Sequence, residues 1–326
     1  MVSEAVTEGI PRKLKKWIAV VGRWTFDNDC VTYLGPEKDG AFPFGICLSD
    51  VFLAEGELAG SIEIKQQDTP TGGAAGRFLI GYRSPSERYI TVGLGGYGRA
   101  YVLAEYLPEV GWTPKEVAGS ASSLTGAHSV GVRIHGQRMT LNVDDVRVFE
   151  TVMDFPLPTG QAGLFAWGNH PIEFKSISVR QLPARVFVVM QFSDPYQQLY
   201  LDVIQPVARE FGLEAYHVGE LAGPGTILND IVQGLVESKI IIAEITPPNQ
   251  NVFYELGYAH ALGKPTILLA ERGKQLPFDI TQYRCLFYDN TIGGKKAIEQ
   301  GLRKHFRAIL HDWSGSNGNG LREKSL

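Results

Sequence analysis

The hydrophobic pattern of the chain changes near residue 184, and this change constrains the fold more than any other feature. Before it, short stretches alternate apolar and polar residues, with Gly, Pro, Asp or Ser between them, at 61–65, 77–82, 89–94, 130–134 and 140–143. After it, apolar residues run without interruption at 186–190 and 240–243. Alternation is typical of antiparallel strands, and continuous runs are typical of parallel strands covered on both faces. We therefore predict an all-β unit followed by an α/β unit.

The alternating part of the chain predicts a β-sandwich. Two of its hairpin turns are recognisable, at 135–138 and at 143–146, each between two alternating stretches. Regular short strands separated by such turn signals are typical of this architecture. The segments that we expect are a tail over 1–16, the sandwich over 17–182, an α/β domain over 183–312 and a disordered tail over 313–326.

The order of features in the sandwich resembles that of the concanavalin A-like lectin and glucanase jelly roll. The turn G-x-x-G-L at 160–164 and the closing strand F-x-x-I-x-V at 174–179 carry this resemblance, which covers about half of the chain. It implies a fold rather than a function. A glycine motif, G-x-G-x-x-G at 93–98, lacks the βαβ surroundings of a dinucleotide-binding loop, so we interpret it as a glycine-rich strand or hairpin.

Composition excludes several classes of function. The 326 residues are 44% hydrophobic and carry a net charge of -4, which is unlike a protein that binds nucleic acid. Three scattered cysteines fit a reducing compartment, so we expect a cytoplasmic protein. The histidines and cysteines show no metal-binding spacing, and the apolar run at 17–21 is too short to span a membrane. We expect no metal, no cofactor, no nucleic-acid partner and no membrane partner.

The second unit alternates strands and helices. Strands are predicted at 186–190, 213–218, 240–245, 266–270 and 284–288, and helices at 196–211, at 226–236, around residue 255 and at 294–310. This order predicts a doubly wound parallel sheet of the flavodoxin-like kind. Ligands of such sheets bind beyond the carboxyl ends of the strands, and the helix that carries Glu255 begins at that edge.

Glu255 is the main candidate for chemistry at this edge. With Asn249 or Asn251 near the start of the helix, we expect Glu255 in about the first turn, where free N–H groups bind polar ligand atoms. An acidic residue there also has a structural explanation, because it complements the helix dipole by about 0.3–1 kcal/mol. Spacing by itself does not separate the two interpretations.

The stretch N-x-N-V-F-Y-E-L-G-Y-A-H-A-L-G-K-P at 249–265 resembles TIR-like (Toll/interleukin-1 receptor-like) and nucleoside 2-deoxyribosyltransferase-like proteins. The run V-F-V-V-M-Q-F at 186–192 and the segment 277–280 share in the resemblance. It implies that Glu255 is catalytic and that an N-glycosidic bond is cleaved in NAD or in a nucleoside, with NAD as substrate rather than cofactor. The substrate-binding residues expected around Glu255 are Gln191, Phe192, Ser193, Asp194, Glu220, Asp230, Glu244, Asn249, Asn251 and Tyr254.

Two positions differ from the pattern of these families. Gln250 replaces the proline of N-P-N, and Glu244 stands about where deoxyribosyltransferases place an aspartate that protonates the base. Nicotinamide in NAD is already a cationic leaving group and needs little help from an acid, so one carboxylate suffices. We therefore expect an NAD glycohydrolase. The alternatives are a nucleoside 2-deoxyribosyltransferase-like enzyme, in which Glu244 supplies the proton, and a non-catalytic nucleotide-binding or adaptor module.

The resemblance also suggests a role for the sandwich. Two-domain arrangements with a TIR-like domain commonly pair a sensing or assembling module with an NAD-consuming one. We expect the sandwich to bind an unidentified ligand, glycan or protein, and the enzyme to form a homo-oligomer on activation in bacterial defence signalling. The alternative for the sandwich is an oligomerisation scaffold.

Overall fold

The computed structural model describes residues 9–38, 42–66, 73–124, 126–220, 226–277, 280 and 283–313. Within them the chain forms two compact units. The β unit comprises the chain up to Ile134, Arg138–Val152 and Leu157–Leu182, and the α/β unit comprises His135–Gln137, Met153–Pro156 and the chain from Pro183 onward. Phe278 and Asp279 of the resembling segment lie outside the described residues, and so does the expected tail beyond Trp313.

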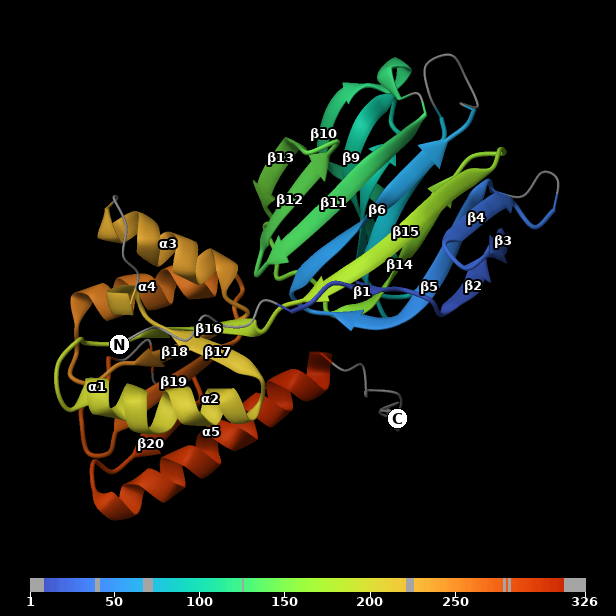
Figure 1. Ribbon diagram of the computed structural model, residues 1–326. Coiled ribbons are helices and arrows are strands. Elements are labelled where there is room, and N and C mark those ends of the chain that lie inside the picture. The colour runs from blue at the N-terminus through green and yellow to red at the C-terminus, as the bar shows by residue number, and fades with distance from the viewer. Residues whose placement is uncertain are drawn as a thin grey trace, which may run out of the picture. The chain divides into compact units, whose positions relative to one another are not determined.

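The described part of the β unit is built from two antiparallel sheets (Figure 1). The first, sheet 1, has the order β13 (Val146–Val152), β12 (Arg138–Val143), β11 (Ala127–His135), β6 (Gly56–Ile64), β15 (Ile172–Gln181), β4 (Cys30–Gly35), β3 (Arg23–Phe26), with β1 (Arg12–Lys13) pairing β15. The second, sheet 2, has the order β10 (Gly111–Ser120), β9 (Arg99–Leu107), β8 (Tyr89–Gly95), β7 (Ala75–Tyr82), β14 (Gly160–Trp167), β5 (Phe44–Leu53), β2 (Trp17–Val21). A short 3₁₀ turn, Ala121–Ser123, follows β10.

The predicted alternation and turns are found in the β unit. Along β12 every second residue is buried, as expected for a strand with one face on a core. Asp144 and Asp145 connect β12 to β13 with φ values of 50° and 62°, the conformation of a two-residue hairpin turn. The glycine motif at 93–98 forms the end of β8 and the turn into β9, so the prediction of a glycine-rich strand and hairpin is confirmed.

The sandwich begins earlier than predicted. Arg12 and Lys13, which we expected in a tail, form β1 and pair with Val179 and Ser178 of β15. The side chain of the next residue, Leu14, is buried, and its N–H donates to the carbonyl of Ile177 at 2.9 Å. Burial of this leucine and the added backbone hydrogen bonds explain why the segment joins the sheet.

The α/β unit alternates strands and helices as predicted. Its elements are β16 (Ala184–Val189), α1 (Tyr196–Leu199), a π-helical turn (Tyr200–Ile204), α2 (Gln205–Glu210), β17 (Leu213–Tyr216), a 3₁₀ turn (Val218–Glu220), α3 (Ile227–Glu237), β18 (Ile240–Glu244), α4 (Gln250–Ala261), β19 (Thr266–Glu271), β20 (Cys285–Tyr288) and α5 (Ile292–Trp313). The strands are parallel, in the order β17-β16-β18-β19-β20.

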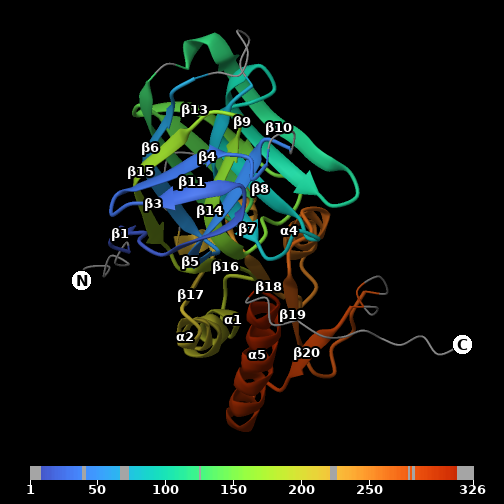
Figure 2. The same cartoon turned by 90° about the vertical axis from the view of Figure 1, so that its right-hand side faces the viewer.

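Helices cover both faces of the parallel sheet (Figures 1 and 2). On one face, Ile240 and Ile242 of β18 pack with residues of α1, the π-helical turn, α2 and α5. On the other face, Ile241 and Ala243 pack with residues of α3 and α4. Both faces of β18 are therefore covered by apolar side chains, which accounts for its uninterrupted apolar sequence.

The first helical segment of the α/β unit differs from the prediction of one amphipathic helix at 196–211. A π-helical turn at Tyr200–Ile204 separates α1 from α2. Pro206 lies near the start of α2 and has no N–H to donate to the carbonyl of Asp202, four residues before it. The break in the α-helical hydrogen-bond pattern falls at this proline, as is usual for insertions of this kind.

Candidate functional site

A pocket of about 700 Å³ opens beyond the carboxyl ends of β16 and β17, between the first turns of α3 and α4. In the observed strand order β16 lies between β17 and β18, so the chain turns to opposite sides of β16 to form these two strands. This is the topological switch point at which open α/β sheets bind ligands. The lining residues are Met190, Gln191, Phe192, Val218, Gly219, Ile227, Leu228, Asp230, Ile231, Asn249, Asn251, Val252, Tyr254 and Glu255.

Glu255 lies in the wall of this pocket, on α4. Asn249 caps the helix, its side chain accepting from the N–H of Asn251 at 2.9 Å. Glu255 is therefore six residues after the cap, in the second turn, and our prediction of the first turn was wrong. The helix-dipole effect falls off within the first turn, so the structural explanation for this acidic residue is weakened.

The carboxylate of Glu255 is buried and has no partner among the residues that the structure describes. Its residue is 9% exposed. Among the described residues it accepts no hydrogen bond and forms no ion pair, and burial raises its pKa to about 7. A buried carboxylate without a partner destabilises the fold unless it is protonated or meets a ligand. Such perturbed groups in a pocket are candidates for functional residues.

Exposed apolar side chains form the rim of the pocket. Phe192 follows β16, Ile227 and Leu228 begin α3, and Tyr254 lies on α4, and each has about half or more of its surface exposed. Large apolar side chains that remain in water around a concave site are typical of surfaces that cover a ligand. Phe192 and Tyr254 can stack on a planar ring.

The polar residues that line the pocket include a second carboxylate. Asp230, in the first turn of α3, lines the pocket together with Gln191, Asn249 and Asn251. The side-chain amide of Gln191 donates to Oγ of Ser193 at 2.9 Å, which fixes its orientation at the end of β16. Amide and carboxylate groups that line an apolar pocket can hold the hydroxyl groups of a sugar.

Four of the expected substrate-binding residues do not line the pocket: Ser193, Asp194, Glu220 and Glu244. Ser193 contacts it through Gln191, while Asp194 is exposed beyond it. Glu220 is exposed in the 3₁₀ turn, where its carboxylate lies 3.6 Å from Nε2 of His217.

Glu244 requires a correction. In β18 it alternates with Ile242, so it points to the face covered by α5, whereas Glu255 belongs to α4 on the opposite face. Its carboxylate is 1% exposed and accepts from the N–H of Thr246 at 3.0 Å, from the hydroxyl of Thr246, and from the hydroxyl of Tyr288 at 3.0 Å. Glu244 therefore does not line the pocket and cannot protonate a base bound there.

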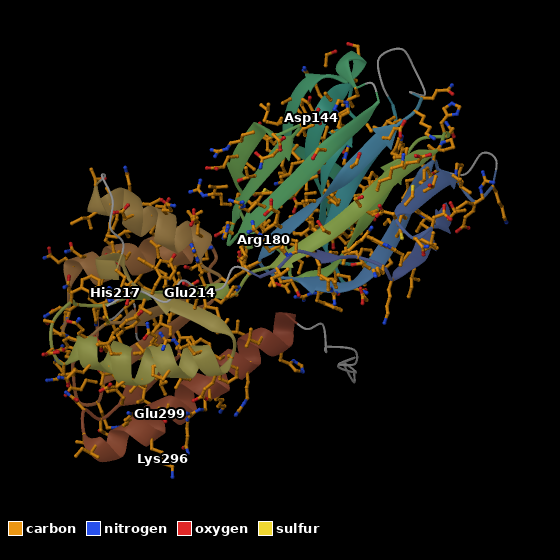
Figure 3. All side chains as sticks on the ribbon, in the orientation of Figure 1. Asp144, Arg180, Glu214, His217, Lys296 and Glu299 are labelled. Atoms are coloured by element: carbon orange, nitrogen blue, oxygen red, sulfur yellow. The ribbon has the colours of Figure 1, made fainter. Side chains whose placement is uncertain are left out.

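His217 is a neighbour of the pocket that the sequence did not indicate. It follows β17, at the end of that strand opposite to Glu214 (Figure 3). Its ring lies 4.8 Å from the ring of Phe192, and Nδ1 accepts from the N–H of Gly219 at 3.0 Å. Burial lowers the pKa of the His217 ring. His217 positions two lining residues, and no spacing motif marks such a role in the sequence.

Two features are absent from the residues that the structure describes. No group of three or more His, Cys, Asp or Glu side chains in these ranges is arranged to hold a metal ion. No helix that the structure describes combines the length and apolar composition needed to cross a membrane.

Comparisons with known proteins gave matches among solved structures only. No protein-family model matches the chain, and no curated protein matches it. Among solved structures, carbohydrate-binding module CBM66 from Bacillus subtilis is 15% identical over 52% of this chain and 97% of that one, with a TM-score of 0.43. A CMP N-glycosidase from Clostridium botulinum is 20% identical over 37% and 98%, with a TM-score of 0.31. The TIR domain of a Toll-related receptor from Hydra magnipapillata is 16% identical over 38% and 97%, with a TM-score of 0.32. At these values the likenesses assign the chain to no family.

Proposed function

We propose that the α/β unit is an N-glycosidase in which Glu255 is the catalytic carboxylate, and that its sheet is of the flavodoxin-like class. The observation that carries this proposal is the carboxylate of Glu255, 9% exposed and without a described partner, in the wall of a pocket at the switch point of the sheet. The sequence resemblance of 249–265 to TIR-like and deoxyribosyltransferase-like proteins agrees with it.

Cleavage of an N-glycosidic bond develops positive charge on the sugar. An ionised carboxylate beside the anomeric carbon stabilises this charge or attacks the carbon directly. The apolar lining around Glu255 lowers the local dielectric and so strengthens that interaction. The ionised form of Glu255 is the active one in this mechanism, and the rate should follow its deprotonation.

NAD is the substrate that we propose first. Glu244, the residue expected to protonate a neutral base, lies on the opposite face of the sheet. A pocket without that acid is suited to a leaving group that departs without protonation. The nicotinamide ring of NAD is positively charged, so it leaves as a neutral molecule without taking up a proton. A single carboxylate then carries the reaction.

A second candidate is supported by Asp230. This carboxylate lines the same pocket as Glu255, from α3 on its other side. If Asp230 delivers a proton to a neutral base, the substrate is a nucleoside or nucleotide, as in deoxyribosyltransferase-like enzymes. The two candidates therefore differ in their requirement for Asp230.

Assays of the full-length protein test both candidates. NAD is incubated with concentrated protein and nicotinamide release is measured, and deoxyinosine with adenine tests base exchange. Glu255→Gln should lower the active rate by about 10²–10⁴-fold, because it removes the charge and keeps the size. Glu214→Gln, at the far end of β17, is the matched control and should leave the rate unchanged.

Asp230→Asn then separates the substrates. We expect Asp230→Asn to change the rate of nicotinamide release from NAD by less than about tenfold. If the substrate is a nucleoside with a neutral base, the same variant should lower the rate of base cleavage by about 10²–10⁴-fold. Equal rates for wild type and Glu255→Gln would refute the proposal. Tight binding of NAD with no turnover would instead show a nucleotide-binding module.

A further inference from the structure

A second pocket lies on the β unit, on the face of sheet 2 that points away from sheet 1. A Cβ placed on Gly76 of β7 would lie 2.6 Å from Cγ2 of Ile62 in sheet 1, so Gly76 faces the space between the sheets. The next residue, Arg77, therefore faces outward. Phe165 of β14 is in register with Arg77 and lies on the same face. This pocket shares no lining residue with the pocket around Glu255.

Arg77 is a buried cation without an acidic partner among the described residues. It is 3% exposed. Nε donates to the carbonyl of Gly95 at 3.0 Å, Nη2 donates to the same oxygen, and Nη1 lies 3.4 Å from Oγ1 of Thr91. All of these partners are neutral. Glu105, the buried carboxylate of β9, pairs instead with Arg88 at 2.7 Å and Lys115 at 3.0 Å.

The guanidinium of Arg77 retains its charge and some of its donors. Burial lowers its pKa to about 10, so it stays protonated at neutral pH. Of the five N–H donors of an arginine, the three contacts with Gly95 and Thr91 use three. Within the described ranges, two N–H groups of Arg77 therefore remain for another acceptor. A buried charge that the protein leaves uncompensated is costly, and an anion that pairs with it removes this cost.

Aromatic rings form the walls around this charge. The pocket has a volume of about 320 Å³ and is lined by Gly73, Ala75, Arg77, Gly96, Tyr97, Trp112, Phe165 and Trp167. The guanidinium carbon of Arg77 lies 5.6 Å from the ring centre of Tyr97 and 5.7 Å from that of Phe165. Trp112 packs on Phe165 with ring centres 4.8 Å apart. A volume of this size accepts one ring rather than a chain of rings.

The glycine motif at 93–98 keeps the pocket open. Gly96 has a φ of 103°, and a Cβ there would lie 1.9 Å from Nη2 of Arg77. Any other residue at this position would cover the guanidinium and strain the backbone. Gly95 supplies the carbonyl that holds Arg77 in place. The motif therefore has a function in the β unit that is unrelated to dinucleotides.

We propose that this pocket binds a small organic acid whose carboxylate is attached directly to a ring. The carboxylate accepts from the two remaining N–H bonds of Arg77, and the ring packs against Tyr97, Trp112 and Trp167. Sugar acids and aromatic acids share this chemistry. The ligand is thus distinguished from a neutral sugar by its charge.

Binding to the full-length protein, measured by calorimetry, tests the proposal with matched pairs. D-glucuronate is compared with D-glucose, and benzoate with benzyl alcohol. The acid of at least one pair should bind roughly tenfold or more tightly than its neutral partner, because a charge-assisted hydrogen bond is lost in the neutral one. The pair that shows the larger preference distinguishes a sugar acid from an aromatic acid.

Two variants and a control locate the site. Arg77→Met should abolish the preference for the acid, while Arg133→Met, an arginine of sheet 1 that pairs with Glu57, should leave it unchanged. Tyr97 has a φ of 54°, a backbone conformation that glycine adopts without strain, so we expect Tyr97→Gly to fold. This variant tests the site if Arg77→Met does not fold. It should weaken binding of the acid severalfold by removing one wall.

Three results would overturn this inference. They are equal affinity for the acid and neutral members of both pairs, no binding of either acid at about 10 mM, and a preference for the acid that survives in Arg77→Met.

Discussion

Two buried glutamates lie on opposite faces of the parallel sheet and share one electrostatic property. Burial raises the pKa of Glu244 and the pKa of Glu255 to about 7. They differ in their partners. Glu244 accepts hydrogen bonds from Thr246 and Tyr288, whereas Glu255 has no partner among the described residues and lines a pocket.

The difference shows that a raised pKa does not by itself locate a functional site. Hydrogen bonds from Thr246 and Tyr288 offset part of the desolvation of Glu244, and these contacts tie the end of β18 to its surroundings. The desolvation of Glu255 is not compensated within the described fold. A buried carboxylate that lowers the stability of the fold and faces a pocket is best explained by a role in binding or catalysis.

The largest effect that we expect is a difference in stability between two equivalent substitutions. Glu244→Leu leaves the donors of Thr246 and Tyr288 without an acceptor and should lower the free energy of unfolding by about 2–4 kcal/mol. Glu255→Leu removes a buried charge and no hydrogen bond, and should be neutral or stabilising at pH 8. Urea unfolding followed by helical circular dichroism measures both, because the α-helices lie in the α/β unit.

Glu244→Gln is the matched control for this comparison. It keeps one acceptor oxygen for the same donors, so it should lose less stability than Glu244→Leu. If Glu255→Leu lost as much stability as Glu244→Leu, Glu255 would have a structural role and the distinction between the two faces would fail.

The sequence predicted the position of these glutamates along the sheet but not their faces. Continuous apolar runs identified the parallel strands, and the helix after β18 placed Glu255 at the ligand edge. Alternation places Glu244 on the face of Ile242, but the face on which α4 packs depends on the path of the whole chain. The predicted start of α4 depended on whether Asn249 or Asn251 caps the helix. In the structure Asn249 is the cap.

The pocket around Arg77 could not be predicted from the sequence for a related reason. In an alternating strand an arginine is usually exposed to solvent. Arg77 is buried because Tyr97, Trp112 and Phe165, which are distant in sequence, lie around it through the order of strands in sheet 2. The glycine motif was correctly separated from dinucleotide binding, yet its contact with Arg77 required the register of β7 and β8.

A second, smaller effect concerns pH. The folded pKa of Glu255 lies above its ordinary value of 4.5, so the associated stability is full below about pH 4.5 and is lost as the pH rises through 7. Glu255→Gln removes this titration. Relative to wild type it should therefore gain about 1–3 kcal/mol between pH 5 and pH 8, measured by urea unfolding at both values.

The reaction should depend on pH in the opposite sense. Ionised Glu255 is the active form, so the rate of N-glycoside cleavage should rise between pH 6 and pH 8. A rate that falls over this range would assign Glu255 the role of an acid. If the free energy of unfolding of Glu255→Gln varied with pH in the same way as that of wild type, the carboxylate of Glu255 would be solvated in the folded protein.

The smallest effect sharpens the comparison at Glu244. Tyr288→Phe removes one donor to its Oε1 and should lower the free energy of unfolding by about 1 kcal/mol, while raising the pKa of Glu244 further. Tyr254→Phe, on the pocket side, removes an exposed hydroxyl and should leave stability unchanged. Unfolding curves and cleavage rates of both variants test this. A fall in the rate of Tyr288→Phe would connect the two faces, because the network around Glu244 would then support the pocket through β18.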